Sequence, residues 1–452
     1  MLVPRLTRGV ALTACAVLAL TATACGDKDD KEAGTPAPQV RLYGTDGNMQ
    51  NSFGKEFTDQ AGVLSGMKGT TPLTPLSQDF KSRLRTVDPK LNDFLYAAET
   101  YDAVVISSIA AQLAGTTNPA KIAQQINGVT LTGERCDSAA QCLKLARSGV
   151  DVEYRGASLT RGGFTAAGEP STASYGTLHF NDSDQLDDGK TEYVGAGDES
   201  AASTAAPPAP KKQEGGKNDK KDGSPLKIGG LLPKTGDLAL AYPPLIAGAK
   251  LAIKDVNAAG GVLGDPVQWI DGDDGTNPKV AKETVARHIA AGVHVIIGAG
   301  ASGISRAVLP DVVAAGIVLF SPCNTDAGLS SPDDKGLYFR TAPSDILQGR
   351  ALADVILRDG PHKIALVARK DAYGEGLQGY VRTELEKAGI GEDKLKLVTY
   401  DPPENPATST LDFSAGAKEI KSFGADAVLV IGFGESAQVI KALTAAGVQI
   451  RH

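Results

Sequence analysis

A glycine-rich loop at residues 293–303 is the first place where this sequence could do chemistry. It reads Val-His-Val-Ile-Ile-Gly-Ala-Gly-Ala-Ser-Gly, an apolar strand followed by G-x-G-x-x-G at the start of a helix. This spacing is typical of a dinucleotide-binding fingerprint, which also needs an acid at the end of the next strand to bind a ribose. The next strand, 317–321, instead runs into Pro-Cys-Asn-Thr before Asp326. A nicotinamide or flavin enzyme is therefore the alternative. The favoured interpretation is an anion site, because a glycine loop that opens a helix offers backbone N–H groups and a positive dipole end to a carboxylate.

An acid-rich loop at residues 271–277 resembles a metal site only in its density of acids. It reads Asp-Gly-Asp-Asp-Gly-Thr-Asn and lacks the glycine at the sixth position of an EF-hand. A loop that caps a helix beginning at Pro278 is the better interpretation. Hydrolase signals are also weak, because the chain has no G-x-S-x-G elbow. We therefore expect no metal, no cofactor and no catalytic residue.

The N-terminus carries export signals. Residues 1–24 combine early arginines, an apolar run at 10–20 and small residues before Cys25, as in a secretory signal peptide. The triplet Ala-Thr-Ala before Cys25 resembles the lipobox of bacterial lipoproteins. We expect lipidation of Cys25, a polar tether over 25–38, no transmembrane helix and an extracytoplasmic location on the cell membrane. The alternative is an ordinary cleaved signal with an incidental cysteine.

Two of the remaining cysteines are spaced for a local bridge. Cys136 and Cys142 are close enough to form a disulfide in the oxidising compartment that export implies. Zinc, the alternative, would favour C-x2-C or a Cys/His pattern, whereas five residues separate these cysteines and only five histidines are scattered along the chain. We predict the disulfide, which leaves Cys323 unpaired.

Polar linkers divide the chain. Residues 25–38 and 198–224 bury too little apolar surface to fold. They separate a segment at 39–197 from another at 225–452. The net charge is −7, and apart from residues 211–221 the Lys and Arg residues are dispersed. Nucleic acid is therefore not an expected partner.

Alternating strands and helices must position the glycine loop. In 225–452, we expect strands at 226–232, 267–270, 293–297, 317–321, 363–368, 394–399 and 427–431, with helices at 245–258, 278–291, 302–314, 346–358, 376–388, 413–423 and 435–446. This order predicts right-handed βαβ units on parallel sheets, an α/β fold. The last helix has no predicted strand after it. Segment 39–197 opens with such a strand, 40–43, and continues with helices at 92–112 and 120–126 and a strand near 174–180.

Several stretches then resemble one family, the periplasmic leucine/isoleucine/valine-binding proteins, which are the type I solute-binding proteins of ABC importers. In 225–452 these are Leu-Leu-Pro-Lys-Thr-Gly from 231, Asp-Val-Asn-Ala-Ala-Gly-Gly from 255, Ile-Gly at 297 through Ser302, Ser-Pro-Cys-Asn-Thr from 321, Arg-Thr-Ala-Pro-Ser-Asp from 340 and Tyr-Gly-Glu-Gly from 373. In 39–197 they are Gly-Thr-Asp-Gly from 44, residues 66–72, Glu-Thr-Tyr-Asp-Ala-Val from 99 and the segment around Cys136 and Cys142.

The resemblance implies a fold and a ligand site. The fold is the type I periplasmic-binding-protein fold, two doubly wound Rossmann-like lobes with crossovers near 340–345, 70–75 and 163–174. The ligand lies in the cleft between the lobes. The residues that correspond to the family's ligand contacts are Ser302 and Thr325 for the carboxylate, Asp46 for the ammonium group, and Cys323, Asn324, Tyr373, Phe433 and Ala241 around the cleft.

Some of these positions depart from the family. Ala241 stands where branched-chain binders have an aromatic residue, with Tyr242 displaced by one. Cys323 and Asn324 replace small residues, and Asn324 could add a hydrogen bond that favours a more polar ligand. The expected ligand is therefore a branched-chain amino acid or a similar small amino-acid-like molecule.

The order of the two segments is inverted relative to the family, as in a circular permutation. Joining 452 to 40 would restore the family order, so 39–197 and 225–452 together form one bilobal domain. Alternatives are a fusion of two partial copies that complete the fold by exchange between chains, and an artificial rearrangement.

The resemblance implies a lipid-anchored binding protein that closes on its ligand, does no chemistry, and works with the permease and ATPase subunits of an importer. A ligand sensor that uses the same clamp is the alternative.

Overall fold

The computed structural model describes residues 39–212, 225–403 and 410–451. The predicted signal peptide, the lipidation site Cys25 and the tether lie outside these residues. Of the helices in the described part, none is long and apolar enough to cross a membrane.

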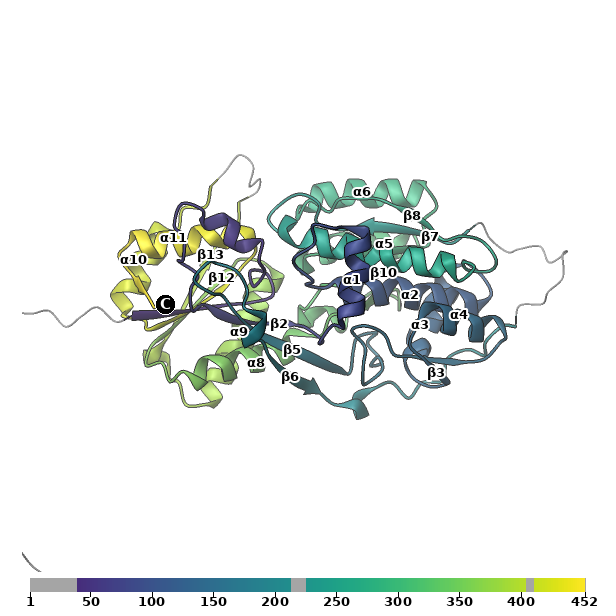
Figure 1. Ribbon diagram of the computed structural model, residues 1–452, viewed down its shortest axis with the longest axis horizontal. Helices are drawn as coiled ribbons and strands as arrows, with labels where there is room; N and C mark the ends of the chain where they lie inside the picture. Colours follow the sequence, from purple (N-terminus) through teal and green to yellow (C-terminus); the bar gives the residue numbers. More distant parts are fainter. Residues whose placement is uncertain (1–38, 213–224, 404–409, 452) are drawn as a thin grey trace, which may run out of the picture. The chain divides into compact units, whose positions relative to one another are not determined.

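Strands and helices alternate through residues 225–451, as predicted (Figure 1). The strands are β1 (Gln39–Gly44), β2 (Lys68–Pro72), β3 (Glu134–Cys136), β4 (Val152–Tyr154), β5 (Thr172–His179), β6 (Glu192–Gly197), β7 (Lys227–Leu231), β8 (Gln268–Ile270), β9 (Val295–Gly298), β10 (Val318–Ser321), β11 (Tyr338–Arg340), β12 (Ile364–Arg369), β13 (Leu395–Tyr400), β14 (Ala427–Ile431) and β15 (Gln449–Ile450). The helices are α1 (Gln78–Val87), α2 (Ala97–Ala114), α3 (Pro119–Ile126), α4 (Ala139–Arg147), α5 (Tyr242–Ala258), α6 (Pro278–Ala290), α7 (Ser302–Ala314), α8 (Asp345–Arg358), α9 (Ala372–Lys387), α10 (Ser414–Phe423) and α11 (Ala437–Ala445).

The first sheet is built from residues 225–451 alone. Its order is β11-β10-β9-β7-β8, and all neighbouring strands are parallel. Successive residues of its strands face opposite layers, since Val295 and Ile297 join a core cluster with α2 and α5, whereas Ile296 joins one with α6 and α7. Both faces are covered, which is why these strands are apolar without alternation. Helix α2 belongs to the first segment, so both segments build this half of the fold.

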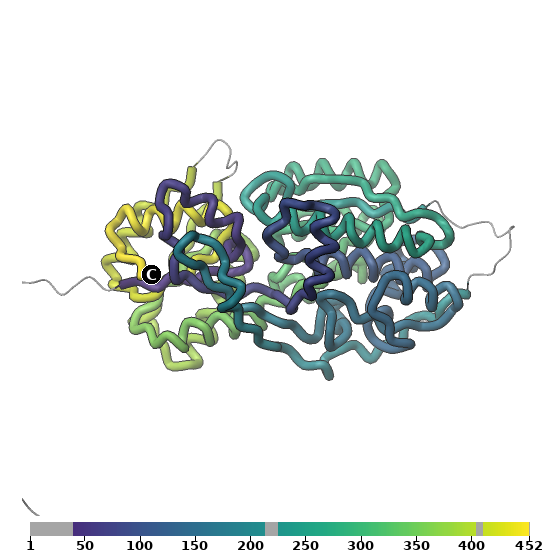
Figure 2. Tube along the Cα trace, in the orientation of Figure 1, coloured from purple at the N-terminus to yellow at the C-terminus, as the bar shows by residue number. Residues whose placement is uncertain are grey.

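The second sheet also mixes the two segments. Its order is β13-β12-β14-β1-β2-β5-β6, with β15 beside β1. Strand β1 pairs in parallel with β14 on one side and with β2 on the other. Figure 2 shows the purple start of the described chain among the yellow C-terminal elements. The predicted mixed α/β architecture with parallel sheets is confirmed, and β1 occupies the place expected for the strand that follows the last helix.

Three features differ from the sequence predictions. Strands β5 and β6 are antiparallel additions at the edge of the second sheet. A short strand, β15, does follow α11 and pairs with Gln39 and Val40 of β1. The first part of the predicted linker at 198–224 is attached to the fold. Ser203 N donates a hydrogen bond to Phe164 O, and Lys211 N donates one to Leu113 O. Main-chain hydrogen bonds, which the polar composition does not reveal, attach these residues to the fold.

Two local predictions match the structure. Cys136 and Cys142 form the predicted disulfide, with Cα atoms 5.4 Å apart, while Cys323 is unpaired and buried. The acid-rich loop caps α6, because Asn277 Oδ1 accepts a hydrogen bond from Lys279 N at 2.9 Å and Pro278 occupies the first turn. Among the described residues, no three His, Cys, Asp or Glu side chains form a group that could bind a metal ion.

Candidate functional site

A small cavity lies where strands of both sheets end. Its volume is about 20 Å³, and residues from both segments line it. Asp46 follows β1, Ser302 begins α7 after β9, Cys323 follows β10, Tyr373 lies in the first turn of α9 and Phe433 follows β14. Ligands of parallel α/β sheets bind at the carboxyl ends of the strands. The topology therefore brings the predicted residues to the position where a ligand site is expected.

The Asp46 carboxyl group lines this cavity and accepts three side-chain hydrogen bonds. Oδ1 accepts hydrogen bonds from Gln348 Nε2 at 2.8 Å and from the Tyr373 hydroxyl at 2.7 Å, and Oδ2 accepts one from the Tyr96 hydroxyl at 2.8 Å. Burial raises the pKa of Asp46, although these hydrogen bonds act in the opposite direction. All three donors are uncharged. The site therefore orients a buried carboxyl group with no cation beside its three hydrogen-bond donors.

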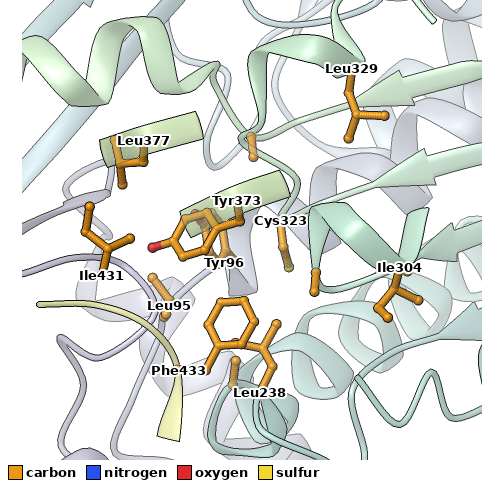
Figure 3. Packing of buried hydrophobic residues seen from close by; sticks show 14 of the residues in the cluster. Leu95, Tyr96, Leu238, Ile304, Cys323, Leu329, Tyr373, Leu377, Ile431 and Phe433 are labelled. Atoms are coloured by element: carbon orange, nitrogen blue, oxygen red, sulfur yellow. The ribbon is translucent and has the colours of Figure 1, made fainter. Parts of the chain in front are cut away.

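Two aromatic rings form one wall. The rings of Tyr373 and Phe433 stack with centroids 5.3 Å apart and an interplanar angle of 18°. The guanidinium carbon of Arg369 lies 3.9 Å from the centre of the Phe433 ring. Figure 3 shows Tyr373, Phe433 and Cys323 gathered at this wall. Stacking and the cation–π contact fix the rings, so the wall is rigid before any ligand arrives.

Arg369 anchors that wall through a buried ion cluster. It pairs with Glu435 at 2.7 Å, with Asp371 at 2.6 Å and with Asp237 at 3.6 Å. Burial alone would lower the pKa of Arg369, but the surrounding acids raise it. Asp237 lies in the loop before α5, so the cluster connects that loop to the end of β12.

The glycine loop supplies the opposite wall at the start of α7. Gly300 N donates to Asp274 Oδ2 at 2.8 Å and Ala299 N donates to Ser305 Oγ at 3.1 Å, so these two amides already have partners. In the first turn of α7, Ile304 N and Ser305 N both donate to Ala301 O at 3.1 Å, whereas the amides of Ser302 and Gly303 have no acceptor within the helix. Burial raises the pKa of Asp274 to about 7. The loop can therefore present the amide end of α7 to a carboxylate.

The loop at residues 321–325, which ends at Thr325, mainly supports the walls of the cavity through hydrogen bonds. Of its residues, Cys323 lines the cavity. Asn324 Nδ2 donates to Ala299 O at 3.1 Å and to Gly300 O at 3.0 Å, and its Oδ1 accepts from the Tyr338 hydroxyl. Neither Asn324 nor Thr325 is among the residues that line the cavity. The predicted extra hydrogen bond from Asn324 to a polar ligand is therefore not available in this arrangement, because its amide group is used to fix the glycine loop.

Sequence reasoning missed three important residues. Tyr96 and Gln348 bind Asp46, and Leu95 lines the cavity beside the predicted Ala241. Tyr96 has a left-handed backbone, with φ of 56°, directly before α2. None of these residues belongs to a recognisable motif. Gln348, for example, meets Asp46 only through a tertiary contact. The stretch Glu-Thr-Tyr-Asp from 99 lies close to Tyr96 and was the nearest available signal.

Comparisons with known proteins identify the second segment. Residues 225–451 match the family described as periplasmic binding protein. The Leu/Ile/Val-binding protein homolog 3 of Brucella melitensis is 29% identical over 228 residues, which cover 50% of this chain and 59% of that protein. The Leu/Ile/Val/Thr-binding protein of Salmonella typhimurium is 29% identical over 226 residues, which cover 50% of this chain and 60% of that protein. The chain thus spans about 60% of the length of these relatives.

Solved structures give a similar coverage. LivJ of Streptococcus pneumoniae in complex with isoleucine has a TM-score of 0.43 at 23% identity, over 50% of this chain and 63% of that one. The leucine-binding protein LivK of Thermotoga maritima has a TM-score of 0.43 at 25% identity, over 49% of this chain and 61% of that one. Together with the fold described above, the match over residues 225–451 shows that this chain belongs to the periplasmic binding protein family.

Proposed function

We propose that this chain is the solute-binding protein of an ABC importer and that it binds a branched-chain amino acid or a similar small amino-acid-like ligand. The observation that carries the proposal is the position of Asp46. It comes from the first segment, yet it shares one cavity with Ser302 at the start of α7 in the second. A carboxylate at one side and the first two amides of α7, at Ser302 and Gly303, at the other suit a zwitterion, with its ammonium group at Asp46 and its carboxylate at Ser302.

The uncharged surroundings of Asp46 support an ammonium ligand. Its carboxylate accepts hydrogen bonds from two tyrosine hydroxyls and one amide, and none of these donors is charged. A buried carboxylate is stabilised most effectively by a cation. The ligand's ammonium group would supply this cation, and it would favour the ionised form of Asp46.

The size of the cavity supports binding by lobe closure. A volume of about 20 Å³ accommodates roughly one water molecule. An amino acid therefore requires the walls to separate before it binds. Closure of the walls around the ligand would then convert binding energy into a changed surface for the permease and ATPase subunits.

The cellular setting is part of the same proposal. We infer export by the signal at 1–24 and anchoring through Cys25, which would place the protein at the outer face of the cell membrane. We also infer that 39–197 and 225–452 form one circularly permuted domain within a single chain. The parallel pairing of β1 between β14 and β2 supports this inference. The proposed protein does no chemistry.

Isothermal titration with a small ligand panel tests the proposed function. The panel contains L-leucine, L-isoleucine, L-valine and 4-methylpentanoate, which has the carbon skeleton of leucine without the ammonium group. L-leucine should bind at least about tenfold more tightly than 4-methylpentanoate, because only leucine neutralises Asp46. Equal affinity for the two molecules would contradict the proposed role of Asp46. If none of the three amino acids bound, the branched-chain ligand class would be wrong.

A further inference from the structure

A second and much larger cavity adjoins the candidate ligand site, since Leu95 lines both. Its volume is about 460 Å³, within the range of small-molecule pockets. Every residue that lines it lies between Met49 and Tyr193, so the first segment alone builds it. The match to the periplasmic binding protein family covers only residues 225–451. The features of this cavity therefore have to be interpreted from its own residues.

Two unpaired cations face this cavity from α1. Lys81 Nζ lies 5.2 Å and the Arg85 guanidinium carbon lies 5.0 Å from the centre of the Phe94 ring. Neither cation has an ion-pair partner among the described residues, and Arg85 Nε donates only to Leu91 O, at 3.2 Å. Like charges four residues apart on a helix repel each other. An anion bound between them would remove this repulsion.

The acids that line the same cavity form no ion pair with these cations. Asp93 accepts hydrogen bonds from Asn51 N at 2.6 Å and from Ser52 N at 3.1 Å, so both carboxylate oxygens bind the backbone. Asp188 is exposed on the loop before β6 and forms no ion pair within the described part of the chain. Lys81 and Arg85 therefore have no ion-pair partner among the acids that line this cavity.

A buried amide lines the cavity without partners. Gln50 is 1% exposed, and neither its side-chain nitrogen nor its side-chain oxygen has a hydrogen-bond partner among the described residues. A buried amide without partners costs free energy, so native proteins rarely contain one. Leu73 and Leu178 form an apolar part of the cavity wall. The cavity thus combines an unpaired amide, an apolar wall and two unpaired cations.

We propose that this cavity is a second ligand site for a small organic molecule with one carboxylate and an apolar body. The carboxylate would bind between Lys81 and Arg85, because a guanidinium and an ammonium group beside an aromatic ring suit a planar anion. The body would pack on Phe94 and Leu178, and a hydroxyl group at its far end would bind Gln50. No ammonium group is required, which separates this ligand class from that of the Asp46 cavity.

The probe for this site is 4-hydroxyphenylacetate, titrated by isothermal calorimetry into the purified full chain. The double variant Lys81→Gln/Arg85→Gln should bind it at least about tenfold more weakly. The matched control Lys90→Gln, an exposed lysine that does not line the cavity, should bind like the parent. The uncharged probe 4-hydroxyphenylacetamide should also bind at least about tenfold more weakly to the parent. Identical melting temperatures for all variants would show that they are folded.

Three results would overturn the proposal. They are no binding of the probe to the parent at about 10 mM, unchanged affinity in the double variant, and loss of binding in Asp46→Asn but not in the double variant. The last result would place the probe in the first cavity. A Gln50→Leu variant should lose the preference for 4-hydroxyphenylacetate over phenylacetate, and an unchanged preference would remove Gln50 from the site. These titrations contain no amino acid, so their failure is distinct from failure of the proposed transport function.

Discussion

The two cavities differ in how their polar groups are satisfied. In the small cavity, the three donors around Asp46 come from distant parts of the chain, and Arg369 is enclosed by three acids. In the large cavity, Lys81 and Arg85 of α1 lack ion pairs within the described residues, and the side-chain amide of Gln50 lacks hydrogen bonds there. The first arrangement holds a buried carboxyl group among uncharged donors. The second holds two cations that form no ion pair within the described residues. The comparison indicates two ligand chemistries, a cation-bearing ligand in one cavity and an anion in the other.

Removal of a cation should have its largest effect at the small cavity. We expect Arg369→Met to lower the free energy of unfolding by about 3–5 kcal/mol, because it leaves Glu435, Asp371 and Asp237 without their partner. Urea unfolding measures this change. The control Arg358→Met, in an exposed pair, should leave the unfolding midpoint close to that of the parent. A loss below about 1 kcal/mol in Arg369→Met would show that the cluster does not stabilise this wall.

The small cavity should also give stability a pH dependence. Burial raises the pKa of Asp274 to about 7 from an ordinary value of 3.8, so the folded protein binds this proton more tightly than the unfolded chain does. The stabilising contribution of the protonated group is complete below about pH 4 and is lost as the pH rises through about 7, a change of about 2–4 kcal/mol.

Urea unfolding at a mildly acidic and a mildly alkaline pH tests this effect. The difference in unfolding free energy between the two conditions should shrink in Asp274→Asn, because asparagine does not titrate. The exposed control Asp311→Asn should retain the parent difference. If Asp274→Asn showed the same difference as the parent, the titrating group would lie elsewhere.

The smallest effect on stability is expected at the large cavity. Lys81→Gln/Arg85→Gln should change the unfolding free energy by less than about 1 kcal/mol, because removing a like-charge pair from α1 offsets the loss of two partly exposed cation–π contacts with Phe94. The same urea titration measures this change. A loss of more than about 1 kcal/mol would mean that these cations stabilise the fold, and the contrast between the two cavities would then disappear.

Local pattern predicted most of the framework and part of the site. Continuous apolar runs such as 317–321 and 427–431 are strands because both faces are covered, and this signal lies in the residues themselves. The resemblance supplied Asp46, Ser302 and Tyr373, which the topology brings to one cavity. The strand predicted near 174–180 corresponds to β5, but its antiparallel pairing and its partner strand β6 were not predicted, because this pairing depends on a sheet edge rather than on a buried apolar run.

Long-range contacts account for what the sequence did not reveal. Tyr96 and Gln348 reach Asp46 from positions 50 and 302 residues away along the chain. Asn324 was assigned to the ligand because of its polar side chain, yet its amide fixes carbonyl groups of the glycine loop. Which partner a buried polar group finds depends on the assembled fold, and no local periodicity encodes it.

Titration of L-leucine into four single variants tests the central claim, that Asp46 and Ser302 bind one ligand between them. We expect Asp46→Asn to bind at least about 30-fold more weakly than the parent, because the ligand's ammonium group loses its charge partner. Ser302→Ala should bind about fivefold to tenfold more weakly. The matched controls Asp311→Asn and Ser422→Ala, both at exposed positions, should bind like the parent. Parent-like affinity in both Asp46→Asn and Ser302→Ala would contradict the proposed site.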